Sequence, residues 1–203
     1  GNRTPASGGG PPRLGMTPTD PTSVALRELR SVLNKLVPEK LESLTTDAML
    51  LRLPDAPALD KVVALLLATA VANPTHHAVH ADFAAGFASG WRGTDDRAAA
   101  GPHFTHRLGR ACLEKLLDFF DSLDEAEATG SAVAEAHWAD RRSLVGYIGC
   151  LAQVELINST GLRGVLDELL DNADTAAKRA PTGQRAVDEC AELASRLLVL
   201  KKL

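Results

Sequence analysis

The sequence is poor in aromatic residues, which make up only 4% of its 203 residues. β-Sheets favour aromatic and β-branched side chains, whereas leucine and alanine, which together form nearly a third of this chain, are strong helix formers. A protein built mainly from β-sheet is therefore a poor match to this composition. The sequence predicts an all-α fold.

Cysteine is scarce as well. The chain has three cysteines, an odd number, which lie far apart and form no CxxC motif: Cys112, Cys150 and Cys190. This pattern argues against a disulfide framework or a zinc site and fits a reducing compartment. The longest unbroken apolar run, residues 62–68, is far shorter than the roughly 20 residues that a membrane-spanning helix needs. No cationic and apolar leader opens the chain. We therefore expect a cytoplasmic protein.

A surplus of positive charge is also missing, since the formal net charge is −4. A dedicated nucleic-acid binder usually carries a basic surplus, because counterion release from phosphates supplies most of its affinity. Contact with RNA or with an acidic partner would have to come from a local patch. The candidates are Arg107 and Arg110 on one predicted helix and Lys178 and Arg179 in a predicted loop. For each of them a solvated surface position is the alternative interpretation.

No catalytic motif stands out. A Gly-rich phosphate loop, a GxSxG string and an HExxH string are all missing. Four carboxylates lie in or beside an alanine-rich loop, where nothing would raise their pKa by burial: Asp121, Asp124, Glu125 and Glu127. Cys112 and Cys150 fall within apolar stripes, which indicates core thiols rather than nucleophiles. We predict a protein that is not an enzyme and needs no cofactor.

His76, His77 and His80 resemble a metal site in their spacing, because His76 and His80 share a helix face at i, i+4. Zinc held at that spacing would need a third ligand and a glutamate between the two histidines. Here Ala78 and Val79 lie between them. We interpret these histidines as half-buried packing residues and predict no metal site.

The chain divides into two parts. Residues 1–21 are mostly Gly, Pro, Ser and Thr, which cannot bury enough apolar surface to become ordered, so we interpret them as a flexible lead-in. In residues 22–203, apolar residues recur every three and four positions, as on one face of a helix. The pattern predicts eight helices, over residues 22–35, 41–51, 59–72, 75–89, 104–123, 135–157, 162–170 and 184–200. The predicted long loops are residues 90–101, 124–134 and 173–182.

The predicted helices form four antiparallel pairs of roughly 35 to 55 residues each. Helix pairs that recur near 40 residues are typical of HEAT-type α-solenoids. The hairpins follow one another without a long crossover connection, which favours an α-solenoid of about four pairs. A globular helical bundle is the alternative.

Three local strings resemble the middle domain of the eukaryotic translation initiation factor 4G family. Residues 33–40, Leu-Asn-Lys-Leu-Val-Pro-Glu-Lys, are similar to the Leu-Asn-Lys-Leu-Thr-Pro-Glu string of that family's first helix pair. Residues 59–83 follow its second pair without a gap, through the Asn73-Pro74 break. Residues 147–151, Tyr-Ile-Gly-Cys-Leu, are similar to its Phe-Ile-Gly-Glu-Leu string. The resemblance extends from about residue 22 to residue 200.

The resemblance implies a scaffold for cap-dependent translation initiation. In this family the domain is a crescent of HEAT repeats that holds both lobes of a DEAD-box RNA helicase, initiation factor 4A, in an orientation that favours its active form. It also contacts RNA and other initiation factors, and the wider chain binds the cap-binding protein. The first corner is the connection between the first two predicted helices, residues 34–40. The resemblance implies that its helicase-binding residues are Asn34, Lys35, Leu36, Pro38 and Glu39.

The chain also departs from the family pattern. Val37 replaces the threonine whose hydroxyl caps the second helix. Arg141 and Arg142 lie two positions from the family's arginines, and two residues turn a helix by about 200°, so we do not assign them the family's roles. A fifth repeat, usual in the family, has no counterpart here.

Two alternatives to the initiation scaffold remain open. One is a related adaptor that serves mRNA decay, splicing or poly(A)-binding protein. The other is a solenoid that binds RNA by itself. Purely local physics also explains the first corner, because a lysine complements the carbonyl end of a helix and asparagine tolerates unusual dihedral angles there.

Overall fold

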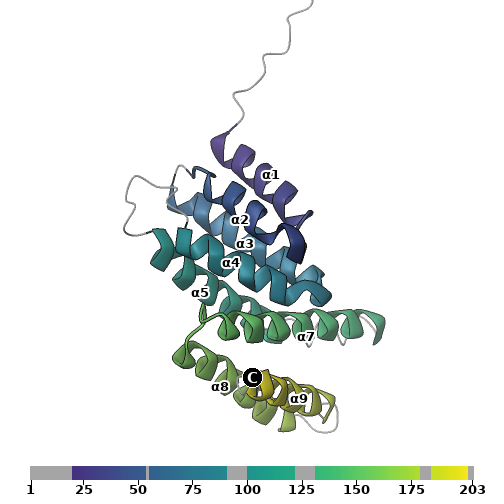
Figure 1. Ribbon diagram of the computed structural model, residues 1–203. Helices are drawn as coiled ribbons and strands as arrows, with labels where there is room; N and C mark the ends of the chain where they lie inside the picture. The colour runs from purple at the N-terminus through teal and green to yellow at the C-terminus, as the bar shows by residue number, and fades with distance from the viewer. Residues whose placement is uncertain (1–19, 54, 91–99, 122–130, 179–183, 201–203) are drawn as a thin grey trace, which may run out of the picture.

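The computed structural model describes residues 20–53, 55–90, 100–121, 131–178 and 184–200, and all regular structure in these segments is helical (Figure 1). The predicted all-α fold is confirmed. The α-helices are α1 (Pro21–Leu33), α2 (Leu41–Met49), α3 (Ala56–Ala72), α4 (His77–Gly90), α5 (Ala100–Asp121), α7 (Ser131–Gln153), α8 (Ser159–Ala177) and α9 (Gln184–Leu200). Two short 3₁₀ helices, η1 (Pro38–Lys40) and η2 (Pro74–His76), precede α2 and α4.

The first helix begins where the polar lead-in was predicted to end. The carboxylate of Asp20 accepts hydrogen bonds from the backbone N–H groups of Thr22 (3.3 Å) and Ser23 (3.1 Å). Pro21 occupies the first turn, where its missing N–H costs nothing. The leucine stripe of α1 then turns inward through Leu29 and Leu33. Residues 1–19, most of the predicted lead-in, lie outside the described residues.

The helices pack in two rows. In the first row α1 packs on α3, α3 on α5 and α5 on α8. In the second row α2 packs on α4, α4 on α7 and α7 on α9. Each helix therefore contacts the one that lies two helices further along the described chain. The last pair, α8 and α9, packs most extensively on itself and reaches the preceding helices mainly through α7 (Figure 1).

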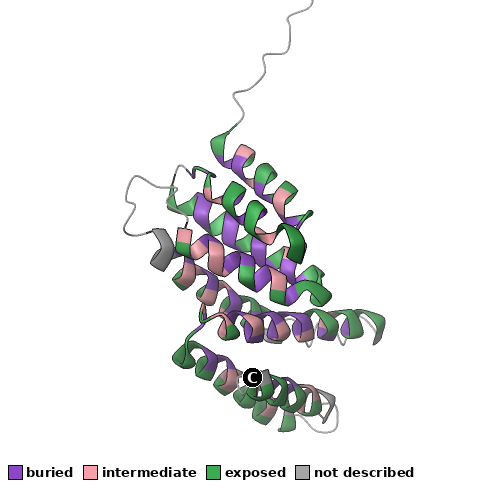
Figure 2. Cartoon of the chain, in the orientation of Figure 1, coloured by how far each residue is buried: buried purple, intermediate pink, exposed green. Residues whose placement is uncertain are grey.

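The centre of the fold is the second helix pair, α3 and α4. No Asp, Glu, Lys or Arg occurs between Lys61 and Asp82. Both helices bury apolar side chains against neighbours on more than one side, as Figure 2 shows by the density of buried residues there. No single described helix is long and apolar enough to cross a membrane, although α3 and η2–α4 together reach that length and hydropathy with a bend of 106° between them.

The end of α7 differs from the prediction, which continued this helix to residue 157. The helix ends at Gln153, and Glu155 adopts the left-handed region with φ 61°. The N–H of Leu156 bonds to the carbonyl of Leu151 (2.9 Å) and the N–H of Glu155 to the carbonyl of Ala152 (3.3 Å). This pair of bonds is a Schellman motif with glutamate where glycine is usual. The apolar spacing through Ile157 continued past the helix end, so periodicity alone gave the wrong boundary.

All three predicted loops also contain helical residues. α5 begins at Ala100 within predicted loop 90–101, α7 begins at Ser131 within predicted loop 124–134, and α8 runs through residues 173–177 of predicted loop 173–182. Asn158 starts α8 by accepting the N–H of Gly161 (2.9 Å). Thr175 bonds back to the carbonyl of Asp171 (2.9 Å), which is compatible with an uninterrupted helix. Residues 173–177 are Ala-Asp-Thr-Ala-Ala, without Gly or Pro, and alanine is the strongest helix former, so the helix continues through them.

We expect Glu155→Gly to raise the free energy of unfolding by about 1 kcal/mol, because glycine adopts the left-handed region without a Cβ clash. The measurement is urea denaturation of the whole chain. Glu155→Ala is the matched control, since it removes the same charge but keeps the Cβ. Equal stability of the two variants would contradict the assignment of strain to Glu155.

Candidate functional site

The first corner, residues 34–40, joins α1 to α2 through a series of short-range hydrogen bonds. The N–H of Asn34 bonds to the carbonyl of Arg30 (3.0 Å), that of Lys35 to Val32 (3.0 Å) and that of Leu36 to Leu33 (3.2 Å). Asn34 has φ −68° and ψ −15°, ordinary right-handed helical values. The predicted tolerance of asparagine for unusual dihedral angles is therefore not used here.

The first corner has one buried side chain and four exposed ones. Leu36 is buried, with 6% of its surface exposed, and it joins the hydrophobic core. Asn34, Lys35, Pro38 and Glu39 are exposed. The Leu36 side chain thus faces the core, whereas the other four predicted binding residues face solvent. Its burial holds the four exposed residues in position.

The exposed charges of the first corner are not neutralised within the described chain. No ion pair or hydrogen bond of the side chains of Lys35 or Glu39 occurs among the described residues. Charged side chains that are already solvated and unpaired lose no internal partner when they bind another protein. The first corner therefore presents one cation and one anion to solvent.

Val37 lies at the start of η1 in an extended conformation, φ −139° and ψ 156°, without any side-chain hydrogen bond to the helix N-terminus. This is the position at which the resembled family has threonine. Pro38 occupies the first helical position, where its fixed φ favours helix initiation. The backbone is therefore arranged for a capping residue that the sequence does not supply.

A second corner, residues 73–76, joins α3 to α4 at the same end of the helix rows (Figure 1). The side-chain amide of Asn73 donates to the carbonyl of Thr69 (2.7 Å), and Thr75 contacts His76 (3.0 Å). All four residues are exposed. Because α1 packs on α3 and α2 on α4, the first and second corners belong to one edge of the molecule.

The predicted RNA-contact residues are engaged with carboxylates. Arg107 forms an ion pair with Asp60 of α3, and Arg110 forms one with Glu114 (2.7 Å). Lys178 pairs with Asp174 at 2.5 Å. The hydrogen bonds to Glu114 and Asp174 raise the pKa of Arg110 and of Lys178, respectively. Arg179 lies outside the described residues.

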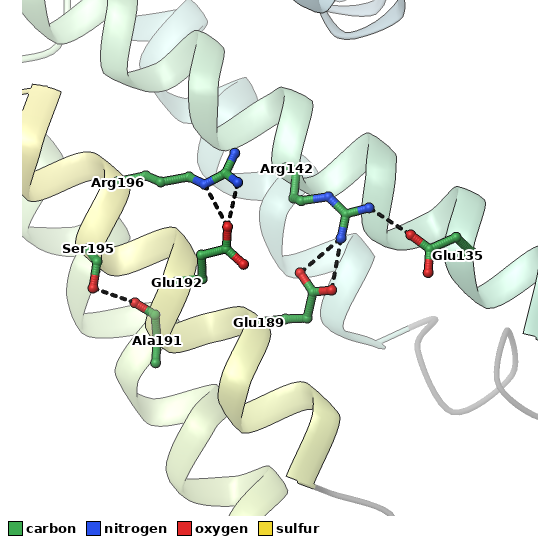
Figure 3. A network of polar contacts seen from close by, with 7 residues as sticks. All are labelled: Glu135, Arg142, Glu189, Ala191, Glu192, Ser195 and Arg196. Atoms are coloured by element: carbon green, nitrogen blue, oxygen red, sulfur yellow. Dashed lines mark hydrogen bonds and ion pairs between the residues drawn. The ribbon is translucent and has the colours of Figure 1, made fainter.

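The two adjacent arginines of α7 serve the fold. Arg142 Nη1 donates to both carboxylate oxygens of Glu189 in α9 (2.8 and 3.0 Å), and its Nη2 donates to Glu135 (2.8 Å; Figure 3). Arg141 is fully buried, where it donates to the carbonyl of Phe119 and stacks 4.2 Å from the Trp138 ring centre. Burial lowers the pKa of Arg141 to about 10. These arginines attach α9 and cover the end of α5.

The histidines are arranged differently from the prediction of two half-buried rings. His76 is exposed, whereas His77 and His80 are buried with 8% and 3% of their surfaces exposed. His77 contacts Ser143 of α7, a partner 66 positions away that no local pattern indicates. Within the described residues, no group of three or more His, Cys, Asp or Glu side chains is arranged to hold a metal ion.

Comparison with known proteins adds no further assignment. Protein-family models give no match to this chain, and the search of curated proteins gives no similar sequence. The candidate site therefore rests on its own geometry and on the three strings of the sequence.

Val37→Thr should raise the free energy of unfolding by about 0.5–2 kcal/mol, since a hydroxyl at this position accepts an N–H of the first turn that now has no side-chain partner. Thermal and urea denaturation measure the change. Val37→Ala, which removes both γ-methyl groups and adds no acceptor, should lower stability instead. A threonine variant no more stable than the wild type would show that the corner does not use a cap.

Proposed function

We propose that the chain is a non-catalytic, HEAT-type scaffold of cap-dependent translation initiation, which acts in the cytoplasm by binding the DEAD-box RNA helicase initiation factor 4A. The observation that carries the proposal is the first corner. Its sequence is the string that resembles the initiation factor 4G family, and its Asn34, Lys35, Pro38 and Glu39 are exposed around the buried Leu36.

Two structural features support the proposed HEAT-type arrangement. The two helix rows repeat the same packing step, in which each helix contacts the one two positions further on. The first and second corners follow one another along one edge. In a solenoid of this kind each pair contacts mainly its neighbours and an extended edge is left for a partner.

The proposed mechanism needs no chemistry on the scaffold. A helicase with two lobes exchanges between open and closed arrangements, and a scaffold shifts that equilibrium only by its difference in affinity for the two. A difference of about 1.4 kcal/mol already changes the population ratio tenfold. A rigid edge that contacts both lobes supplies such a difference. Other initiation factors, including the cap-binding protein, would join through the wider chain.

Of the alternatives, a solenoid that binds RNA by itself is disfavoured by the ion pairs described above. Arg107, Arg110 and Lys178 each have a carboxylate within the same or an adjacent helix, which lowers the local positive potential. An adaptor in mRNA decay, splicing or poly(A)-binding-protein regulation would use a similar edge for another partner. Identification of proteins captured by the chain from a cell lysate distinguishes this adaptor from the initiation scaffold.

The purified chain should form a complex with initiation factor 4A and increase its RNA-dependent ATPase rate. Titration followed by calorimetry and by an ATPase assay measures both effects. A complex without stimulation would favour the adaptor alternative, and absence of both would contradict the proposal. RNA affinity of the chain alone, falling steeply with salt, would favour the RNA-binding alternative.

Charge reversal at the first corner, Lys35→Glu with Glu39→Lys, should weaken the helicase complex by about tenfold or more, which corresponds to about 1.4 kcal/mol. The melting temperature should fall by a few degrees at most, because neither side chain has a partner in the described chain and only the interaction of each charge with its helix end is reversed. Arg163→Glu with Asp167→Lys on the exposed side of α8 is the matched control. If both double variants weakened the helicase complex equally, the helicase would not bind specifically at the first corner.

A further inference from the structure

The last helix pair, α8 and α9, has neighbours on one side only. Among the described helices, α5 and α7 contact it from the side of the earlier pairs, and none lies beyond it (Figure 1). Six large hydrophobic side chains are exposed in the described part of the chain, and three of them belong to this pair: Leu170, Leu198 and Val199, with 56%, 52% and 60% of their surfaces exposed. The last pair therefore leaves apolar surface in contact with water.

Leu170 of α8 and Leu198 of α9 lie on the same face of the pair. The six residues between the two helices reach at most roughly 25 Å, which is too short to return along the roughly 28 Å of α8, so the helices are antiparallel. Leu170 directly follows the buried Leu169, and Leu198 directly follows the buried Leu197. One residue turns a helix by about 100°. In an antiparallel pair that packs through its buried residues, this same turn leads to the same face.

This face points away from α7. Glu189 of α9 accepts a hydrogen bond from Arg142 of α7 (2.8 Å). Leu198 lies nine positions after Glu189, which places it about 180° around the axis of α9, opposite to α7. Three further apolar residues share this side of the pair, since Leu166 and Val187 are half-buried and Ala191 is exposed. We call this surface the end face; its residues are Leu166, Leu170, Val187, Ala191 and Leu198.

The opposite end of the helix rows has a different surface. α1 is the first helix of its row, and its exposed residues from Ser23 to Ser31 are all polar or charged: Ser23, Arg27, Glu28, Arg30 and Ser31. A polar outer face is what a terminal helix of a solenoid needs to stay in water. The end face lacks such a polar layer. Of these two ends of the described chain, the end face therefore gains more when water is excluded from it.

The size and charge of the end face suit a second copy of the chain. Its two helices, 17 and 19 residues long, cover roughly 28 Å by 20 Å, so two such faces would bury about 1,100 Å², near the lower end of specific interfaces. Arg163 and Asp167 are exposed on the adjoining side of α8, and neither forms an ion pair among the described residues. One cation and one anion beside the apolar centre impose no like-charge repulsion between two copies.

We propose that the end face is a homodimer interface, in which two copies of the chain associate about a two-fold axis with Leu170 and Leu198 at the buried centre. An apolar face is complementary to the same face of a second copy, whereas the charged surface of α1 is not. A contact of this kind closes at two copies and does not continue into a filament. The end face follows the sides of α8 and α9, and the first corner lies at the ends of α1 and α2, so the first corner stays exposed in the dimer. The inference does not depend on the proposed partner.

Sedimentation velocity of the wild-type chain tests the dimer without any variant. Over a thousandfold range of concentration, the mass should rise from 21.5 kDa to twice this value and no further. Sodium sulfate should strengthen the association, because sulfate is excluded from apolar surface, whereas a contact made by exposed charges weakens with salt. A mass that stays at one chain, a mass that grows beyond two chains, or dissociation by sulfate would overturn the proposal.

Leu170→Glu with Leu198→Glu should weaken the association by about tenfold or more, because carboxylates would have to leave water in the interface. Leu170→Ala with Leu198→Ala should weaken it by a smaller factor, because it removes apolar area without adding charge. Both leucines are exposed in the single chain, so the melting temperature of the dilute variants should stay close to that of the dilute wild type.

Leu50→Glu is the matched control, since it adds the same charge at a leucine of the first helix pair that is 75% exposed. This variant should associate as the wild type does. If the double glutamate and double alanine variants associated as tightly as the wild type, or if Leu50→Glu weakened the dimer as much as the double glutamate variant, the end face would not be the interface.

Discussion

The fold depends on covering the uncharged second helix pair. α3 and α4 offer water almost no charged surface between Lys61 and Asp82, so they are stable only when neighbours cover them on more than one side. α1, α2, α5 and α7 supply this cover, and each packs on α3 or α4. The two rows of helices follow from this requirement. So does the position of the second corner, which must turn the chain tightly enough to return α4 along α3.

The corners combine a structural and a proposed binding role without conflict. In the first corner, burial of Leu36 fixes the backbone, and the neighbouring charges are left in solvent. A turn held by its own buried leucine does not need Lys35 or Glu39 for stability, so these positions are open to recognition. In contrast, Arg107, Arg110 and Lys178 already have partners within the chain. This difference is why the proposed contact lies on the corner rather than on the cationic helix surface.

The apolar spacing predicted every α-helix that the structure describes, because it reflects which face of a helix is buried. Helix ends were less predictable. The apolar spacing of Val154 and Ile157 continues beyond the Schellman motif at Glu155, and residues 173–177, predicted as loop, are helical. At the site, Asn34, Lys35, Pro38 and Glu39 were correctly expected at a helix corner. The burial of Leu36 separates it from them, and only packing reveals that.

Composition and periodicity by themselves determined the all-α class, the order of the helices and the position of the first corner, because these follow from interactions within a few residues. Tertiary structure decided which polar residues lie inside. Nothing near Arg141 or Ser143 in the sequence indicates burial; each is buried because a helix end, at Phe119 or Val71, brings a free carbonyl to it across the fold. Such pairings join residues 22 and 72 positions apart, and a local pattern contains no information about contacts of that range.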